Sequence, residues 1–239
     1  MTARPVAWLR YRDTVVTERM DDPECDLPTL LRTYAQFPLI NGVVAGWEFT
    51  YRSEIRPRFT GSHHTLLDIG TGGGDVARAL ARRARRDGVQ LSVTAIDPDP
   101  RAAEYVRGLP ATDGVSYRQC TSGTLVDEGA RFDFVISNHV LHHLTGSELG
   151  AVLADSERLA RYAVIHSDIR RTRIGYLLYS LVTGILFRRS FVREDGLISI
   201  RRSFLPAELR AILPARWRVR SQRFFRTLVI FERRVGVSG

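Results

Sequence analysis

Two acidic side chains flank a glycine-rich turn in the first half of the chain. Asp68 stands just before Gly70, Gly72 and Gly74, and Asp97 follows roughly 20 residues later. Glycines at this spacing let a ligand approach the backbone, because no Cβ blocks it. An acid at this distance is typical of a carboxylate that binds ribose hydroxyls. The pattern predicts a cofactor that contains a nucleoside. Alternatively, Asp97 is an ordinary capping or turn residue.

The residue types that are missing narrow the choice of cofactor. All 35 basic residues are arginine, so the lysine of a P-loop and the Schiff-base lysine of a pyridoxal enzyme are both absent. The turn has the pattern GxGGG rather than GxGxxG, which does not fit a dinucleotide fingerprint. Asp68 would repel a pyrophosphate and attract a cationic amino-acid group. These observations point away from NAD and toward a sulfonium nucleoside.

Polar side chains also follow two strongly apolar runs. Asn138, His139, His142 and His143 come after residues 132–137, and Asp168 lies near the end of the next predicted strand. Ligands of open α/β sheets bind at the carboxyl ends of the strands, where these side chains are expected. Histidine titrates near neutrality, which suits the removal of a phenol proton. We predict His139 as the first choice of catalytic base, followed by His143 and Asp168.

Other roles are open to the same side chains. His139 and His143 lie four positions apart. If the segment is helical, they share one face and could bind the same metal ion. No acidic third ligand follows them, so we predict no metal site. For Asp168, helix capping or pairing with a neighbouring arginine is the alternative.

An uninterrupted apolar segment follows these candidates. Residues 174–187 are apolar nearly all round but too short to span a bilayer. Because an all-apolar helix must be buried or contact something apolar, we interpret the segment as a wall of a hydrophobic substrate pocket, with membrane contact or dimerisation as alternatives. The predicted substrate contacts are Tyr34, Phe37, His166, Tyr176 and Tyr179.

Alternating strands and helices would bring these side chains together. Apolar runs predict strands over residues 65–69, 91–97, 115–119, 132–137 and 162–169, and a closing antiparallel hairpin over 216–219 and 227–231. Apolar residues at helical spacing predict helices over 76–86, 101–109 and 147–159. Asp75 suits the cap of the first helix, and Asp195-Gly196 predicts a turn.

Three stretches together resemble a known family. Residues 67–74, Asp97 and residues 132–144 look like the motifs of the class I S-adenosylmethionine-dependent methyltransferases. The resemblance implies an α/β fold with a Rossmann-like seven-stranded sheet, parallel except for an antiparallel last hairpin. It also implies S-adenosylmethionine as cofactor, with the glycines of the turn against its methionine part and Asp97 on its ribose.

The family often has an acid after the third strand that contacts the adenine amino group. Residues 119–122 contain no acid here, so we expect Thr121 or backbone groups to take that place. The predicted cofactor contacts are Asp68, Gly70, Thr71, Gly72, Gly74, Asp97, Pro98, Thr121 and Asn138.

The residue pattern, together with this resemblance, suggests how the chain is divided. Residues 1–63 precede the first cofactor strand and are predicted to form an N-terminal helical lid over the cofactor, with ordinary core packing as the alternative. Residues 64–239 are predicted to form the methyltransferase domain, with a substrate-cap insertion at about 170–205.

Composition sets looser bounds on partners and location. The net charge is +9, but the arginines are scattered rather than striped, so no nucleic-acid partner is expected. Cys25 and Cys120 are far apart and indicate neither a zinc site nor a disulfide framework. No signal segment or transmembrane segment is evident, so we expect a cytoplasmic monomer or homodimer, with transient membrane contact left open.

The predicted function is transfer of a methyl group from S-adenosylmethionine to oxygen or carbon of an apolar small molecule. A phenol, quinol or polyketide-like ring fits, in secondary or quinone metabolism. Two alternatives remain. One is a cofactor-binding protein with a ring-forming, non-methylating activity. The other is a nucleic-acid methyltransferase, whose affinity should fall steeply with salt.

Overall fold

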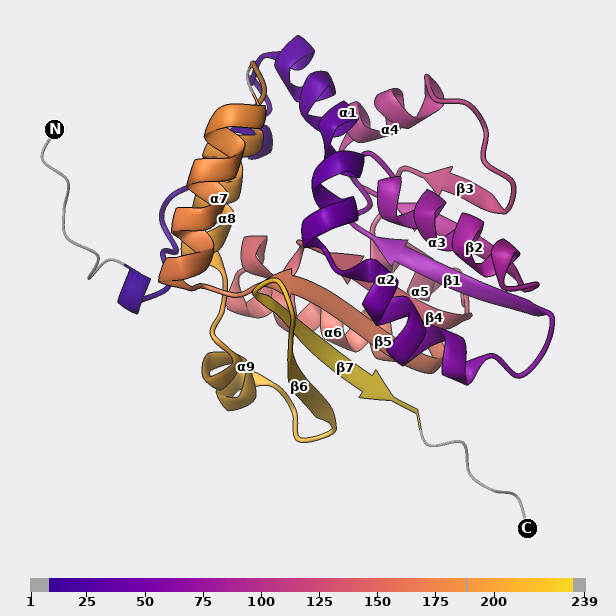
Figure 1. Cartoon of the computed structure of the whole chain (residues 1–239). Coiled ribbons are helices and arrows are strands. Elements are labelled where there is room, and N and C mark those ends of the chain that lie inside the picture. Colours follow the sequence, from indigo (N-terminus) through magenta and orange to yellow (C-terminus); the bar gives the residue numbers. More distant parts are fainter. Residues whose placement is uncertain (1–8, 188, 234–239) are drawn as a thin grey trace, which may run out of the picture.

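The computed structural model describes residues 9–187 and 189–233 (Figure 1). Its strands are β1 (His63–Ile69), β2 (Gln90–Ile96), β3 (Val115–Arg118), β4 (Phe132–Asn138), β5 (Ala160–Ile169), β6 (Trp217–Gln222) and β7 (Arg226–Glu232). Its helices are α1 (Leu27–Val44), α2 (Trp47–Thr50), α3 (Asp75–Arg86), α4 (Pro100–Arg107), α5 (Ser122–Asp127), α6 (Gly146–Leu159), α7 (Arg173–Leu186), α8 (Val192–Arg202) and α9 (Pro206–Ile212). A short 3₁₀ helix, η5 (Leu141–His143), follows β4. Residues 1–8 of the predicted lid and 234–239 of the predicted domain lie outside the described residues.

The seven strands form one sheet in the order β3-β2-β1-β4-β5-β7-β6. Strands β1 to β5 are parallel, and β7 pairs antiparallel with both β5 and β6. The predicted α/β sheet with its antiparallel last hairpin is therefore confirmed. Because the parallel strands end at one edge, Asp68, Asp97, Asn138 and Asp168 are brought to the same side of the molecule.

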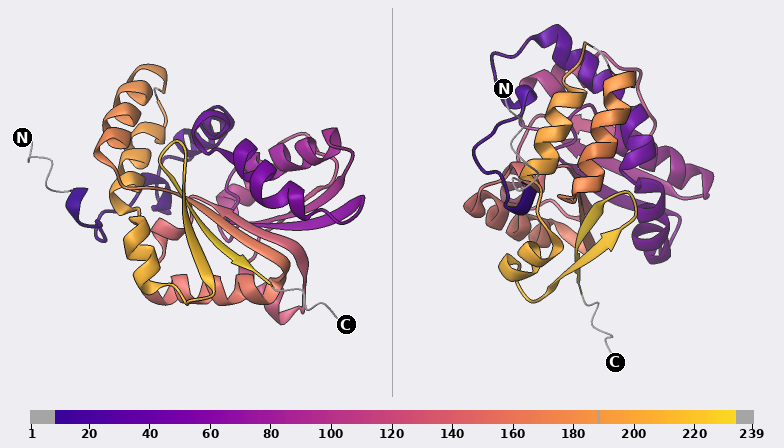
Figure 2. Two further views of the ribbon diagram at one scale, coloured as in Figure 1. Left: turned by 60° about the horizontal axis from the view of Figure 1, so that its bottom comes forward. Right: turned by 60° about the vertical axis from the view of Figure 1, so that its left-hand side comes forward.

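The apolar strand runs are buried on both faces of the sheet. Leu66 and Phe134 face a core that includes side chains of α3 and α2. Their neighbours Leu67 and Val135 face the opposite core, which includes side chains of α6 and α9. Figure 2 shows helices above and below the sheet in this way. Continuous apolar strands are expected in such a three-layer arrangement.

The glycine turn leads from β1 into α3. Asp75 was expected to cap this helix, but Gly74 is the N-cap, with a φ of 69°, and Asp75 is the first helical residue. The backbone at the N-cap position is left-handed, a conformation that glycine adopts more easily than aspartate. The buried Asp75 carboxylate instead accepts a hydrogen bond from the Asn41 side chain, at 3.0 Å.

Gly74 should be required for stability as well as for the turn. A Cβ added there would lie 2.5 Å from the ring of Tyr117. We expect Gly74→Ala to lower the free energy of unfolding by about 2 kcal/mol or more, from the left-handed backbone and the clash together. Gly88 also has a positive φ, but no atom of the described residues lies within 4 Å of such a Cβ, so Gly88→Ala should cost only about 1 kcal/mol. Urea unfolding of both variants measures the difference, and equal losses would contradict the clash.

Helices α7 and α8 stand side by side at one end of the sheet (Figure 2). The turn predicted at Asp195-Gly196 is wrong, because α8 runs through both residues. The Asp195 carboxylate is used by the N-terminal segment, where it accepts the backbone N–H groups of Arg19 and Met20 at 2.8 and 3.0 Å. Gly196 serves close packing, because a Cβ there would collide with the phenol of Tyr179.

Candidate functional site

A cavity of about 950 Å³ lies at the carboxyl ends of the parallel strands. One part is lined by the glycine turn and the ends of β1 and β2. The other part is lined by the residues after β4 together with α7 and α8. Helix α1 adds Tyr34, Phe37 and Asn41 to the wall. A single cavity thus connects the predicted cofactor residues with the predicted substrate segment.

Hydrogen bonds fix the acids around the glycine turn. The Thr71 hydroxyl donates to Asp68 Oδ2 at 2.7 Å, and the Gly72 N–H donates to Asp97 Oδ2 at 2.8 Å. The other oxygen of Asp97 accepts the N–H of Asp99 at 3.0 Å. Each oxygen of Asp97 keeps a second lone pair for a ligand hydroxyl.

Asp68 is the least satisfied of these acids. It is buried, and its Oδ1 has no hydrogen-bond partner within the described chain. Burial, together with the nearby Asp75 and Asp97 carboxylates, raises the pKa of Asp68 to about 7. A buried carboxylate with an unused oxygen at a cavity wall is suited to bind a cationic group, which would satisfy the oxygen and stabilise its charge.

Most of the other predicted cofactor residues share this wall. Gly70, Thr71, Pro98, Thr121 and Asn138 line the cavity, whereas Gly74 does not. Gly74 therefore acts through the turn and the start of α3. The Thr121 hydroxyl is partly occupied, because it caps α5 by accepting the N–H of Thr124.

His139 lines the cavity but is a poor candidate base. Its Nε2 lies 2.7 Å from Nη1 of the fully buried Arg226, which can only donate. Nε2 must therefore accept, so the ring proton of the neutral histidine sits on Nδ1. Burial and the adjacent Arg226 hold the pKa of His139 well below its ordinary value. Arg226 also donates to Asn138 Oδ1 at 2.7 Å.

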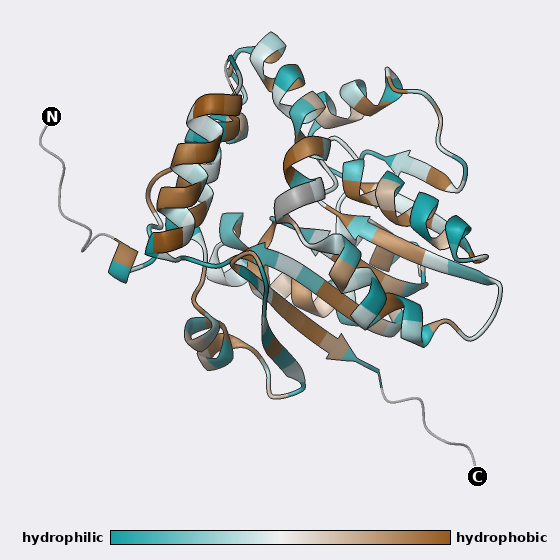
Figure 3. Cartoon of the chain, viewed as in Figure 1, coloured by the Kyte–Doolittle hydropathy of each residue, from teal (hydrophilic) through white to brown (hydrophobic). Residues whose placement is uncertain are grey.

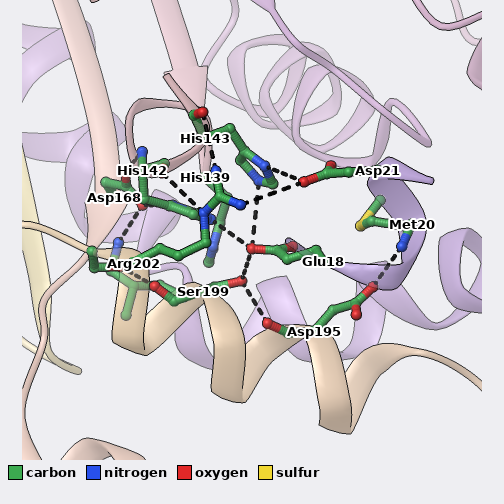
Figure 4. Close-up of polar contacts among 12 residues, drawn as sticks. Glu18, Met20, Asp21, His139, His142, His143, Asp168, Asp195, Ser199 and Arg202 are labelled. Carbon is green, nitrogen blue, oxygen red and sulfur yellow. Dashed lines mark hydrogen bonds and ion pairs between the residues drawn. The ribbon is translucent and has the colours of Figure 1, made fainter. Parts of the chain in front are cut away.

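His142 was placed at this strand end but was not predicted as a base. It is held between two buried acids (Figure 4). Its Nδ1 lies 2.7 Å from Asp168 Oδ1, and its Nε2 lies 3.2 Å from Glu18 Oε1. Burial alone would lower the pKa of His142, but Asp168 and Glu18 outweigh it and raise the pKa to about 9. His142 and Glu18 both line the cavity, whereas Asp168 does not. Asp168, a predicted base, thus orients His142 rather than facing the cavity itself.

His143 completes this cluster (Figure 4). Its Nδ1 lies 3.0 Å from Asp21 Oδ2, and its Nε2 lies 3.7 Å from Glu18 Oε1. Arg202 donates to the backbone carbonyls of His142 and His143 at 3.3 and 3.1 Å. Both histidines are therefore held in position by carboxylates at Nδ1 and by arginine at the backbone.

The predicted substrate residues separate into two groups. Tyr34, Phe37 and Tyr179 line the cavity, but Tyr176 and His166 do not. His166 is completely buried, its ring stacked on Trp217 and its Nδ1 2.8 Å from the Ser137 hydroxyl. His166 lies three positions before the end of β5, within the core, so the prediction that it contacts substrate is not supported.

Helix α7 contributes one face to the cavity and leaves the other open. Leu178, Val182 and Leu186 line the cavity. Its outer face is strongly apolar (Figure 3), and the most exposed large side chains there are Ile174, Leu177, Leu181 and Ile185, at 64–67%. Among the described residues, no helix is long and apolar enough to cross a membrane.

Residues 66–162 match the family model of a methyltransferase domain. The ubiquinone biosynthesis O-methyltransferase of Methylocella silvestris is 42% identical over 81 residues, which cover 33% of this chain and 29% of that protein. The enzyme of the same name from Azorhizobium caulinodans is 29% identical over 157 residues, or 63% of this chain and 56% of that protein. The chain thus matches only part of the length of these relatives.

A solved structure extends the likeness to nearly the whole chain. The plantazolicin methyltransferase, determined in complex with SAH, has a TM-score of 0.65 at 10% identity, over 90% of this chain and 93% of that one. This similarity concerns the fold. The Rossmann-like fold that the motifs indicated is thus shared with a solved methyltransferase, and the match to a methyltransferase domain extends over residues 66–162.

Proposed function

We propose that this protein transfers a methyl group from S-adenosylmethionine to a hydroxyl oxygen of an apolar small molecule. The observation that supports this most strongly is the single cavity with two different ends. One end presents the carboxylates of Asp68 and Asp97 to a cofactor. The other combines the apolar wall of α7 with a buried histidine–carboxylate cluster.

The residues of the first end fit the cofactor's three parts. Asp68 Oδ1 would accept the ammonium of the methionine part, and the free lone pairs of Asp97 would accept ribose hydroxyls. Thr121 and Pro98 line the wall beyond Asp97 and would border the adenine. When bound, S-adenosylmethionine supplies an electrophilic methyl group on a sulfonium.

The second end suits an acceptor with an apolar body and one acidic hydroxyl. Leu178, Val182 and Leu186 would contact the body, and His142 and His143 would lie near the hydroxyl. Methyl transfer to oxygen needs little more than alignment and removal of the acceptor proton. The relatives named for ubiquinone biosynthesis favour a phenol or quinol ring as the acceptor. We also propose that α1, with Tyr34 and Phe37, acts as the lid that keeps water out.

This function is tested by product analysis. The protein is incubated with S-adenosylmethionine carrying a deuterated methyl group and with a panel of catechols, hydroquinones and alkylated phenols. We expect a labelled O-methyl product from apolar catechols or hydroquinones, with matching release of S-adenosylhomocysteine. Cofactor binding without any labelled product would favour the non-methylating alternative, and labelling of RNA or DNA instead would favour the nucleic-acid alternative.

Cofactor binding should depend on pH through Asp68. Its carboxyl must ionise before it can pair with the ammonium, so affinity should fall by up to about tenfold per pH unit below 7. Above about pH 8 the ammonium itself loses its proton, which weakens binding again. Calorimetric titrations across this range, in buffers of different ionisation enthalpy, should show proton release below pH 7. A flat profile, or one that Asp68→Asn leaves unchanged, would contradict this role.

A further inference from the structure

We propose that Glu18, His142 and His143 form a binding site for a divalent transition-metal ion, which holds the hydroxyl oxygen of the methyl acceptor. The sequence alone predicts no metal site, because no acid follows the histidines. In the folded chain the acid comes from Glu18, 124 positions before His142. The metal site stands on the geometry alone, and only its contact with the acceptor rests on the proposed function.

The ligand atoms converge from three directions (Figure 4). His142 Nε2 lies 3.2 Å from Glu18 Oε1, and His143 Nε2 lies 3.7 Å from the same oxygen. One ligand atom from each residue lies within 4.8 Å of the other two. Ligand atoms about 2 Å from a tetrahedral ion lie roughly 3.3 Å apart, close to the two separations from Glu18 Oε1. Two imidazoles and one carboxylate are a donor set that suits Zn²⁺, Fe²⁺ or Co²⁺.

The surrounding groups orient both histidines as they are oriented in metal sites. A metal-binding histidine usually donates its other ring N–H to a carboxylate or carbonyl. His142 has Asp168 at its Nδ1, at 2.7 Å, and His143 has Asp21 at its Nδ1, at 3.0 Å. Each ring therefore directs its Nε2 toward Glu18. Two such pairs aimed at one carboxylate oxygen distinguish this cluster from an ordinary surface ion pair.

The site would also remain open on the cavity side. Glu18, His142 and His143 all line the cavity, next to the apolar wall of α7. Three protein ligands with an open position are typical of catalytic rather than structural metal sites. An acceptor hydroxyl that takes this position would exchange its O–H bond for a metal–oxygen bond and release the proton to water. The metal would thus provide the acceptor oxygen as an anion next to the cofactor end of the cavity.

Equilibrium Zn²⁺ binding to the full chain, after treatment with a chelator, tests the site. We expect stoichiometric binding with a Kd on the order of micromolar or tighter, and visible absorption bands when Co²⁺ replaces Zn²⁺. Glu18→Gln and His143→Gln should each weaken binding by about 100-fold, and Asp21→Asn by about 10-fold. The exposed His63→Gln and Glu24→Gln are the matched controls and should bind as the wild type does.

The outcomes separate this inference from the proposed function. Every variant is also titrated with S-adenosylmethionine, which reports that the cofactor end is folded. Absence of stoichiometric Zn²⁺ binding by the wild type, or equal binding by the variants and the controls, would overturn the metal site. If the metal-free protein still methylates its acceptor at the full rate, the metal's contact with the acceptor is overturned while the methyltransferase function stands.

Discussion

Asp68→Asn should bind S-adenosylmethionine roughly 30-fold more weakly or worse, because removing one member of a buried charge pair costs about 2–5 kcal/mol. The asparagine keeps the size of the side chain and can still accept the Thr71 hydroxyl, which donates to Asp68 at 2.7 Å. Only the charge that faces the ammonium is lost. Calorimetric titration at pH 7.5 measures the effect.

The same variant should be more stable than the wild type when no ligand is bound. Burial raises the pKa of Asp68 to about 7. Above that pH the folded protein contains a buried ionised carboxylate, which lowers the free energy of unfolding. The sign follows from linkage: the native state holds the proton more tightly, and stability falls as pH rises toward 7. Asp113→Asn, an exposed surface substitution, is the control for both measurements. Unchanged cofactor affinity in Asp68→Asn would contradict the assignment.

His142→Gln should lower the turnover of the acceptor by about 10²- to 10³-fold, the usual cost of removing one group that helps to hold an anionic acceptor oxygen. The ring of His142 contacts Asp168 through Nδ1, at 2.7 Å, and Glu18 through Nε2, at 3.2 Å. His142 belongs to the proposed acceptor end of the cavity, whereas Asp68 and Asp97 belong to the cofactor end. The cofactor affinity of His142→Gln should therefore stay within a few-fold of the wild type. The rate of S-adenosylhomocysteine release at saturating cofactor measures the loss.

Two comparisons make this result specific. His139→Gln should retain far more turnover, because the basic Nε2 of His139 is already occupied by Arg226 at 2.7 Å. His142→Gln also removes the ring that two buried carboxylates share as a partner, which should cost about 3–5 kcal/mol of stability. The double variant His142→Gln, Glu18→Gln should recover part of that stability without recovering turnover. Equal turnover losses in His139→Gln and His142→Gln would contradict the assignment.

The fold was accessible from the sequence because its signals are local. The runs around Leu66 and Phe134 are apolar on both faces, which indicates central parallel strands. The glycines between Asp68 and Asp75 mark the turn that follows the first strand. Gly196 was misjudged because a glycine that permits close helix packing looks the same in sequence as one that ends a helix. Its role depends on Tyr179, which reaches it from α7.

Only half of the candidate site could be predicted from the sequence, for a physical reason. The proposed cofactor end is built from strand ends, whose positions follow from the strand pattern, so the place of Asp68 and Asp97 at the cavity could be predicted. The acceptor end depends on contacts across long sequence separations. Glu18 comes from a segment without periodicity, and Arg226 reaches His139 from the last strand. His142 could have been weighed equally with its neighbours, because the pair His142-His143 follows the same strand end.

The most direct test of this account is a calorimetric titration of the purified, ligand-free protein with S-adenosylmethionine and S-adenosylhomocysteine, beside Asp97→Ala. We expect stoichiometric binding of both ligands with a Kd on the order of micromolar, close to −8 kcal/mol. Asp97→Ala should weaken binding of both ligands alike, because both contain the ribose. A folded protein that binds neither ligand would contradict the cofactor assignment and, with it, the proposed methyl transfer.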